Sequence, residues 1–331
     1  MRLPHSLLES QFFALTSAKE LVIAMGDSLS EEESDELHRL AGLGLPPVSS
    51  ALALSTMMGI NPGLLWSMLS RPTRHYRRFT IPKGRSERVI FAPRVALKII
   101  QKWLSIHFEK RFTPLPHVYG FVRGKSHIQA AKIHTTAQWV YSTDIEGFFP
   151  STPIGLVVEA LMSLGYNADS AEMLAKLCCI NGHLAQGSPA SPVISNIVLR
   201  HIDAGLQRIA GDFGCRLSRY ADDIVFSGAQ TPPADLGDVV PELFLDTPWR
   251  LAPEKTHIST APRRLKVHAL LVHGAEVRLT KGYRNRLRAF RHLIKNGRVR
   301  EADLKRIQGH LHYADHVAAE SVVNGDGSAI P

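Results

Sequence analysis

Cysteine is scarce in this sequence, and no long hydrophobic run is present. Three cysteines among 331 residues form neither a disulfide framework nor a zinc-binding pattern, which excludes a disulfide-stapled secreted domain and indicates a reducing compartment. The longest apolar stretch, about residues 48–60, is shorter than the roughly 20 residues that cross a bilayer. Pro4, His5 and Glu9 follow the first methionine too closely for a secretory signal. We therefore expect a cytoplasmic protein that does not enter a membrane.

Acidic residues are also in short supply. The chain has 30 Asp and Glu against 39 Lys and Arg, a formal net charge of +9 and a pI near 9.6. Such a surplus of positive charge favours a polyanionic partner, nucleic acid above all. A hydrophobic content of 44% and a mean hydropathy of −0.05 are ordinary for a globular protein, and 331 residues suffice for two or three packed subdomains.

Two adjacent carboxylates interrupt a strand-like run at residues 219–226. Asp222 and Asp223 stand between Tyr220 and an Ile-Val-Phe segment. Because successive strand residues point to opposite faces, we expect a tight hairpin that holds both carboxylates at its tip. Neighbouring negative charges are costly without a cation, and Mg²⁺ prefers oxygen ligands. An isolated Asp-Asp pair is more often a solvated turn, so the interpretation depends on the rest of the chain.

A third carboxylate, Asp144, ends another β-leaning run at residues 139–144. If its strand neighbours the hairpin, three carboxylates converge and can hold two Mg²⁺ ions, the arrangement used for in-line displacement at phosphorus. Between these acids lies a polar loop at residues 186–192, in which Gly187 permits a close backbone approach and two prolines stiffen the chain before an apolar helix. Such a loop can press against a base pair or a nucleotide.

Three motifs in this order, Asp-x-x-x-Phe-Phe, Gln-Gly-x-Pro-x-Ser-Pro and Tyr-Ala-Asp-Asp, resemble the palm of reverse transcriptases. The resemblance implies an α+β, right-hand polymerase fold with a helical N-terminal region, fingers, an antiparallel palm sheet and a short basic helical thumb. It implies that Phe149 blocks the 2′-OH of an incoming ribonucleotide and that Gln186 touches nucleotide and template. The expected catalytic acids are Asp144, Asp222 and Asp223, and the expected site for two Mg²⁺ ions comprises Asp144, Ile145, Asp222 and Asp223. The rival is an RNA-binding scaffold with an inactive palm, which has no need of these residues.

Basic residues at three places extend the resemblance. The hairpin expected at residues 76–91 resembles the fingers, in which Lys83 and Arg88 grip the triphosphate of a dNTP. Residues 251–258 resemble the next family block, where Lys255 lies near the triphosphate and can protonate the leaving pyrophosphate. The alternatives are a solvated hairpin edge for the first pair and a charged surface turn for Lys255.

Two further basic segments suit a nucleic-acid backbone. The glycine-punctuated loop at residues 117–126 carries Arg123 and Lys125, and we expect it to contact the template unless it is a plain surface loop. Residues 278–300 contain no Asp or Glu and occupy the place of a thumb. Leu287, Phe290 and Ile294 are expected to form the apolar stripe of its helix. Another face, which is expected to bind RNA, carries Arg284, Arg288, Arg291 and Lys295.

Four regions are expected: an N-terminal helical region (1–70), fingers and palm (71–265), palm edge and thumb (266–320) and a loose tail (321–331). A chain of this organisation resembles a bacterial retron reverse transcriptase. The resemblance implies a cognate non-coding RNA as template and primer, priming from a guanosine 2′-OH, a single-stranded DNA product, dNTPs as substrates, an effector or toxin protein encoded nearby, and a role in phage defence.

The chain departs from the retron pattern at two places. Ala130 stands where an Asn-Ala-x-x-His signature has Asn, although His134 is kept, and Val267-His268-Ala269 replaces Val-Thr-Gly. Other stand-alone bacterial defence reverse transcriptases, or a stripped group II intron enzyme, therefore remain alternatives. The sequence leaves open the RNA, the priming chemistry, the effector and the oligomeric state.

Overall fold

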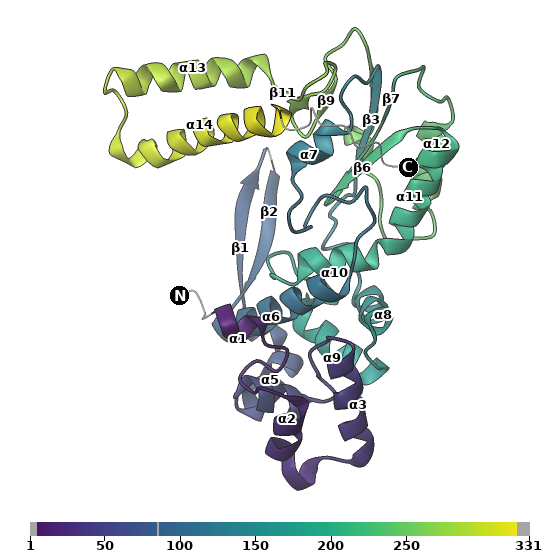
Figure 1. Ribbon diagram of the computed structural model, residues 1–331, viewed down its shortest axis with the longest axis vertical. Helices are drawn as coiled ribbons and strands as arrows, with labels where there is room; N and C mark the ends of the chain where they lie inside the picture. Colours follow the sequence, from purple (N-terminus) through teal and green to yellow (C-terminus); the bar gives the residue numbers. More distant parts are fainter. Residues whose placement is uncertain (1–4, 85, 323–331) are drawn as a thin grey trace. The chain divides into compact units, whose positions relative to one another are not determined.

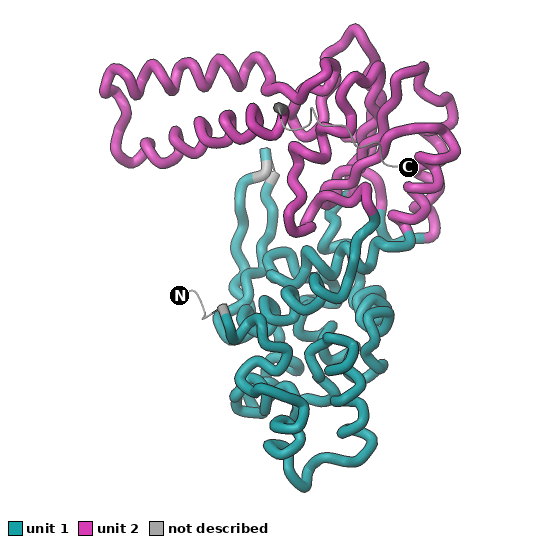
Figure 2. The backbone as a smooth tube through the Cα atoms, viewed as in Figure 1, with its two compact units in different colours: residues 1–115, 146–201, 247–249 teal, residues 116–145, 202–246, 250–331 magenta. Residues whose placement is uncertain are grey.

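The computed structural model describes residues 5–84 and 86–322, and it divides the chain into two units, each assembled from separate segments (Figure 2). Unit 1 comprises residues 1–115, 146–201 and 247–249, and unit 2 comprises residues 116–145, 202–246 and 250–331. The boundaries expected from the sequence, at residues 70, 265 and 320, follow function rather than packing and stay a prediction.

The N-terminal part of unit 1 is helical, as the sequence predicts (Figure 1). Its elements are α1 (His5–Glu9), α2 (Ala18–Met25), η1 (Gly26–Ser28), α3 (Glu31–Gly42), α4 (Ala51–Met58), α5 (Pro62–Ser70) and η2 (Pro72–His75). Four of these helices begin at a polar residue whose side chain accepts a backbone N–H of the first turn; these residues are Ser17, Ser30, Ser50 and Asn61.

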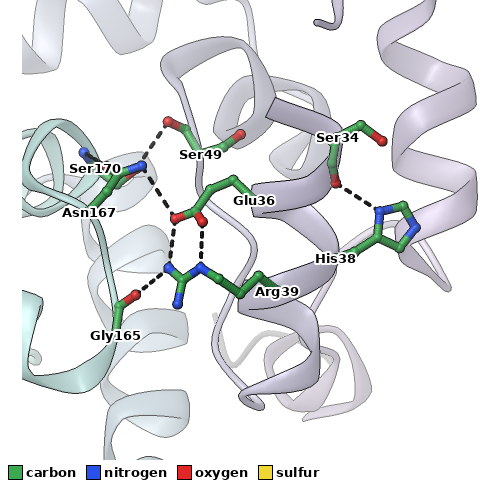
Figure 3. A network of polar contacts seen from close by, with 8 residues as sticks. All are labelled: Ser34, Glu36, His38, Arg39, Ser49, Gly165, Asn167 and Ser170. Atoms are coloured by element: carbon green, nitrogen blue, oxygen red, sulfur yellow. Dashed lines mark hydrogen bonds and ion pairs between the residues drawn. The ribbon is translucent and has the colours of Figure 1, made fainter. Parts of the chain in front are cut away.

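The rest of unit 1 begins with an antiparallel hairpin, β1 (Tyr76–Lys83) and β2 (Ser86–Pro93), in which Tyr76 pairs with Pro93 and Ile81 with Arg88. The elements that follow are α6 (Val95–Arg111), α8 (Ile154–Leu164), α9 (Ala168–Cys178), β4 (Cys179–Ile180), β5 (His183–Leu184) and α10 (Ser191–Val198). A polar network ties α3 to the α8–α9 connection: Arg39 donates to Glu36 and to the carbonyl of Gly165, and Asn167 donates to Glu36 (Figure 3).

Unit 2 is built on a four-stranded antiparallel sheet with the order β6-β7-β3-β8. Its strands are β3 (Trp139–Asp144), β6 (Arg216–Tyr220), β7 (Asp223–Gly228) and β8 (His257–Thr260). A smaller sheet holds β9 (Lys266–Val267), β10 (Leu270–Leu271) and β11 (Arg278–Leu279). The helical elements are α7 (His127–Lys132), α11 (Arg200–Asp212), which starts at the end of a unit 1 segment, α12 (Leu236–Glu242), η3 (Pro253–Lys255), α13 (Lys281–Lys295) and α14 (Glu301–Val322).

The core of unit 2 joins the sheet to the C-terminal helices. Val140 and Val225 of the large sheet pack in one buried cluster with Ile128 of α7, Val267 of the small sheet and Val317 of α14. This burial anchors the end of α14 to the sheet edge. No helix in the described ranges combines the length and the apolar character that a membrane crossing requires.

A buried histidine links α7 to the sheet. The His134 ring is fully buried, with Nδ1 2.7 Å from Ser227 Oγ and Nε2 2.8 Å from Ser218 Oγ. Burial lowers the pKa of His134 to about 3, so the ring is neutral. His134, which matches the retron signature, thus has a structural role here, and the nearby Ala130 is itself fully buried.

Candidate active site

The Tyr-Ala-Asp-Asp segment forms the tight hairpin that the sequence predicts. Tyr220 pairs with Asp223 across β6 and β7, which leaves Ala221 and Asp222 as the two turn residues. On the other side of β7, Asp223 pairs directly with Asp144 at the end of β3. The N–H of Ile145 donates to the Asp222 carbonyl at 3.1 Å. The sheet register therefore brings the three carboxylates together in unit 2.

The surroundings shift the pKa values of Asp144 and Asp223 in opposite directions. Burial raises the pKa of Asp144 to about 6, assisted by the Asp222 charge and by a side-chain hydrogen bond with Asp223, and opposed by the Lys255 ammonium. For Asp223, burial acts upward, but His268, the bond from Asp144 and Lys255 outweigh it, so that its pKa is lowered. Two carboxylates that share a hydrogen bond hold a proton between them, which is the situation that a cation relieves.

Lys255 forms an ion pair with Asp144. Burial lowers the pKa of the Lys255 ammonium, but the three carboxylates outweigh this effect and raise it. The sequence predicted this lysine near a triphosphate, and the structure places its ammonium on the Asp144 carboxylate. The Lys255 side chain is 40% exposed, so an incoming anion can reach it.

The donor set fits a divalent cation that arrives with its substrate. Among the described residues, no group of three or more His, Cys, Asp or Glu side chains is arranged as a ready-made metal site. Mg²⁺ does not need one, because it is commonly held by one or two carboxylates and completed by substrate phosphates and water. The residues that would hold it are Asp144, Asp222 and Asp223, with Ile145 beside them; its charge would neutralise the oxygens at the reacting phosphorus.

A buried arginine fixes the turn that carries Asp222. Arg219 is 0% exposed; its Nε and Nη2 donate to the two oxygens of Asp203 at 2.6 and 2.7 Å, and its Nη1 donates to the Ala221 carbonyl at 2.8 Å. Ala221 has a φ of +59°, a left-handed conformation that costs an L-residue about 1–2 kcal/mol. The hydrogen bonds of Arg219 to Asp203 and to the Ala221 carbonyl, which together form a clamp, thus hold a strained residue immediately before Asp222.

The chain around residues 117–120 supports the same turn from another side. The backbone of Arg219 is bonded to two residues of this segment: its N–H donates to the His117 carbonyl, and its carbonyl accepts from the Tyr119 N–H. A Cβ on Gly120 would lie 2.0 Å from the Ala221 nitrogen, so only glycine fits. Sequence reasoning missed both the clamp and this packing, because it assigned the segment as a whole to the template.

The basic residues of that loop differ in their surroundings. Arg123 is exposed. The Lys125 ammonium donates to the carbonyls of Pro116 and Val118 at 2.8 Å each and lies 4.8 Å from the Tyr119 ring centroid. Burial lowers its pKa. Lys125 is therefore engaged in shaping its own loop, and template contact by either residue stays a prediction.

His268 is a further residue of the site that the sequence did not single out for a role. It has a φ of +48° between β9 and β10, its Nδ1 lies 3.6 Å from Asp223 Oδ2, and its ring lies 5.3 Å from that of Tyr220. The sequence revealed it only as a departure from Val-Thr-Gly. Its proximity to Asp223 arises from packing of the small sheet on the large one, which local sequence does not signal.

The nucleotide contacts predicted for unit 1 lie on the β1–β2 hairpin and on two later loops, which carry Phe149 and Gln186. The Phe91 N–H donates to the Gln186 carbonyl at 2.8 Å, and a Cβ on Gly187 would lie 2.7 Å from the Phe91 oxygen and 3.0 Å from Ile90 Cγ2. Arg88 lies two residues from Ile90, hence on the same face of β2. The structure thus brings Arg88 and the Gln186 loop to one side of the hairpin. Lys83 ends β1, but its side chain lies outside the described part of the chain.

Phe149 belongs to a turn of unit 1 that is fixed from inside. Its ring stacks on Phe148 at 5.4 Å and is partly exposed. Thr152 donates its hydroxyl to the Phe148 carbonyl at 2.8 Å and accepts the Trp249 indole N–H at 3.0 Å. A ring held in this way is suited to a steric role, and its action as a sugar gate stays a prediction.

The basic face of α13 is exposed, with no ion pair to any described residue for Arg284, Arg288, Arg291 and Lys295. The predicted apolar stripe is right at Leu287, which is buried, and wrong at Ile294, which is 38% exposed. Tyr283 and Phe290, on the same side of α13 as Leu287, contact His310 of α14.

Comparisons with known proteins agree with this geometry. The family described as Reverse transcriptase (RNA-dependent DNA polymerase) matches residues 81–277. The chain is similar to Retron Ec86 reverse transcriptase of Escherichia coli, with 28% identity over 86% of this chain and 89% of that protein. It is similar to Retron Mx65 reverse transcriptase of Myxococcus xanthus, with 28% identity over 83% of this chain and 70% of the relative, and to Retron Mx162 reverse transcriptase of the same organism, with 30% identity over 84% and 66%.

Proposed function

The chain belongs to the reverse transcriptase family and is an RNA-directed DNA polymerase, and from that premise we propose that it copies part of a cognate non-coding RNA into single-stranded DNA. The similarity to several retron reverse transcriptases over most of the chain supports this narrower function. In the proposal the RNA serves as both template and primer, synthesis begins at an internal 2′-OH, and the product acts in phage defence together with an effector protein.

The proposed chemistry assigns each described side chain one task. Asp144, Asp222 and Asp223 hold two Mg²⁺ ions, which supply charge neutralisation at phosphorus. Arg219 keeps the turn in place. Lys255, beside Asp144, donates a proton to the departing pyrophosphate as the new bond forms.

The remaining residues bind the nucleotide. Arg88 offers a planar fork of N–H donors that matches phosphate oxygens, and the proposal adds Lys83 as a second cation at the hairpin tip. Gln186 contacts the nucleotide and template. The Phe149 ring excludes a 2′-OH by its volume, which selects dNTPs over ribonucleotides.

The observation that carries the proposal is the direct pairing of Asp144 with Asp223 at the hairpin end, within the residues matched to the family. Replacing any of the three acids by asparagine keeps the shape and removes the charge that two cations require. We expect Asp144→Asn, Asp222→Asn and Asp223→Asn each to abolish metal-dependent dNTP incorporation on a primed RNA template while RNA binding is retained. Asp212→Asn, at an exposed acid at the end of α11, is the matched control. Full activity in any of the three site variants would refute the shared site.

The priming and the product need a separate experiment. The RNA and DNA that co-purify with the protein are treated with RNase, then with a debranching enzyme, and the DNA is run on a denaturing gel. A discrete DNA band that shortens by a few ribonucleotides on debranching supports 2′-OH priming. Heterogeneous DNA that is insensitive to debranching would assign the chain to another bacterial defence reverse transcriptase or an intron-like enzyme. Tight RNA binding without any DNA would favour the scaffold.

A further inference from the structure

A long acid-free stretch lies in the N-terminal part of the chain. Between Glu36 and Glu87 the sequence has no Asp or Glu, whereas the second half of this stretch is rich in arginine. The described structure gives no ion pair to its exposed arginines, which are Arg71, Arg74, Arg77 and Arg78. Unneutralised positive charge on one continuous segment indicates a polyanionic ligand.

An exposed tryptophan stands at the start of this segment. In α5 the side chains of Leu65 and Met68 are buried, but Trp66 points away from them and is 56% exposed. The Arg71 guanidinium lies over the ring, 5.3 Å from its centroid. The other tryptophans of the chain, all within the described ranges, are at most 2% exposed: Trp103, Trp139 and Trp249. The exposure of Trp66 is therefore an exception that packing does not explain.

The pair is presented by ordered backbone rather than by a loose loop. The Arg71 N–H closes α5 by donating to the Ser67 carbonyl at 2.9 Å, and the Ser67 hydroxyl lies 2.9 Å from His75 Nε2. The Arg94 N–H donates to the His75 carbonyl at 2.7 Å. The pKa of His75 is lowered by burial and then by the charges of Arg94 and Arg74, which shows that the surroundings are positive. An aromatic ring in contact with a guanidinium, carried on backbone that is ordered in this way, suits a ligand that has both a ring and a phosphate.

We propose that Trp66, Arg71 and Arg74 form a stacking site for an unpaired nucleotide of single-stranded nucleic acid. A base lies against the indole, and the guanidinium groups bind the adjoining phosphates; base–aromatic stacking of this kind is sequence-tolerant. The template RNA and the nascent DNA share this chemistry. Only the class of ligand, a nucleic acid, is taken from the proposed function. The three residues lie outside the range that matches the reverse transcriptase family.

The exposure pattern supplies a direct readout. Because Trp66 is the one tryptophan of the four that water reaches, quenching of intrinsic fluorescence by an added oligonucleotide reports on its ring. We expect single-stranded RNA and DNA oligonucleotides to quench the full-length protein and duplex RNA to do so far less. Trp66→Phe keeps an aromatic face, so it should retain binding and lose the quenching signal.

Affinity and its salt dependence separate stacking from charge. Trp66→Ala should weaken binding of a labelled single strand by about 5- to 160-fold, the range for one stacked base, and leave the salt slope unchanged. Arg71→Gln should lower that slope by about 0.7, the value for one phosphate contact on a single strand. Arg208→Gln, an exposed arginine of α11, is the matched control and should do neither.

Each outcome assigns or removes the site. A loss confined to RNA identifies the template or primer strand, and a loss confined to DNA identifies the product. The stacking site is overturned if Trp66→Ala binds a single strand with unchanged affinity, or if its affinity for duplex RNA falls by the same factor. It is also overturned if the substitution leaves nucleic-acid affinity intact and removes a protein that co-purifies with the parent, because the surface then binds that protein. Binding is measured in the Asp222→Asn background and dNTP incorporation in the parent, so failure here is distinguishable from failure of the polymerase function.

Discussion

Replacing Arg219 with lysine tests whether the buried clamp sets the position of Asp222. Lysine keeps the positive charge beside Asp203 but lacks the fork, so it cannot also reach the Ala221 carbonyl. Two buried, charge-assisted hydrogen bonds are lost, and each is worth about 1.5–3 kcal/mol, less what the ammonium recovers. We expect the free energy of unfolding to fall by about 2–4 kcal/mol. Removing the charge of Asp203 instead strands a buried guanidinium and costs about 3–5 kcal/mol.

The same substitution has a catalytic consequence that is separate from the loss of stability. Without the clamp, Ala221 relaxes from its left-handed conformation and Asp222 moves; a misplacement near 1 Å costs up to about 10²-fold in rate. The assay is single-turnover dNTP incorporation under conditions where the variant remains folded, with kcat and the KM for dNTP measured separately. We expect kcat to fall and RNA affinity to hold. Arg208→Lys, on the exposed face of α11, is the control for the same chemical change.

A second substitution distinguishes positioning from general damage. Glycine adopts a φ of +59° without strain, so Ala221→Gly should change the parent little, by less than about 1 kcal/mol. In the Arg219→Lys background it should recover part of the lost kcat, because residue 221 no longer has a reason to relax. Strictly additive effects of the two substitutions, or full activity of Arg219→Lys, would refute the reasoning.

Three other predictions follow from the structure. Phe149→Ala should let ribonucleotides compete with dNTPs, which is measured by ribonucleotide misincorporation. If the variant still rejects ribonucleotides as strongly as the parent, the Phe149 ring has only a packing role. The pKa of His134 is lowered to about 3, so the folded protein keeps the ring neutral where the unfolded chain would protonate it. The free energy of unfolding should therefore fall by about 1.4 kcal/mol per pH unit as pH drops below about 6.5. Urea unfolding of His134→Gln should lack this part of the pH dependence. Neutralising the basic face of α13 should weaken RNA binding by a similar factor for all RNA sequences and lower the salt slope by about one unit per phosphate contact. An unchanged salt slope would mean that this face does not contact RNA. The residues replaced are Arg284, Arg288, Arg291 and Lys295.

Local patterns predicted the elements that carry the site. The Tyr-Ala-Asp-Asp hairpin and the strand that ends at Asp144 follow from alternating side chains and from turn chemistry, so they could be placed from sequence. The clamp of Arg219 on Asp203 could not, because a buried ion pair between a strand and a helix leaves no periodic signal. Lys125 illustrates the same limit: a lysine in a glycine-rich loop looks free for phosphate, and only the fold reveals that two carbonyls occupy it.

The periodicity of a helix predicts its packed side, but it does not predict how far along the helix the partner covers that side. Ile294 lies seven residues after Leu287, on the same side of α13 as Phe290. The contact of Phe290 with His310 of α14 confirms that side as the packed one, whereas Ile294, one turn further on, is 38% exposed. A departure from the retron pattern shows the same limit of sequence reasoning. The segment Val267-His268-Ala269 reads as the loss of Val-Thr-Gly, but the fold places the His268 imidazole beside Asp223.

The interleaving of the two units has a consequence for how the protein is made. The Thr152 hydroxyl of unit 1 receives its indole donor from Trp249, and the unit 2 cluster that starts at Ile128 includes Val317. On the ribosome, therefore, neither core can close when its first segments emerge; each must wait for a much later one. Unpaired strands and apolar helices stay open during most of synthesis, when association with other chains is the main hazard. A premature stop before Val317 removes a core residue rather than an appendage, and its product should be cleared by proteolysis.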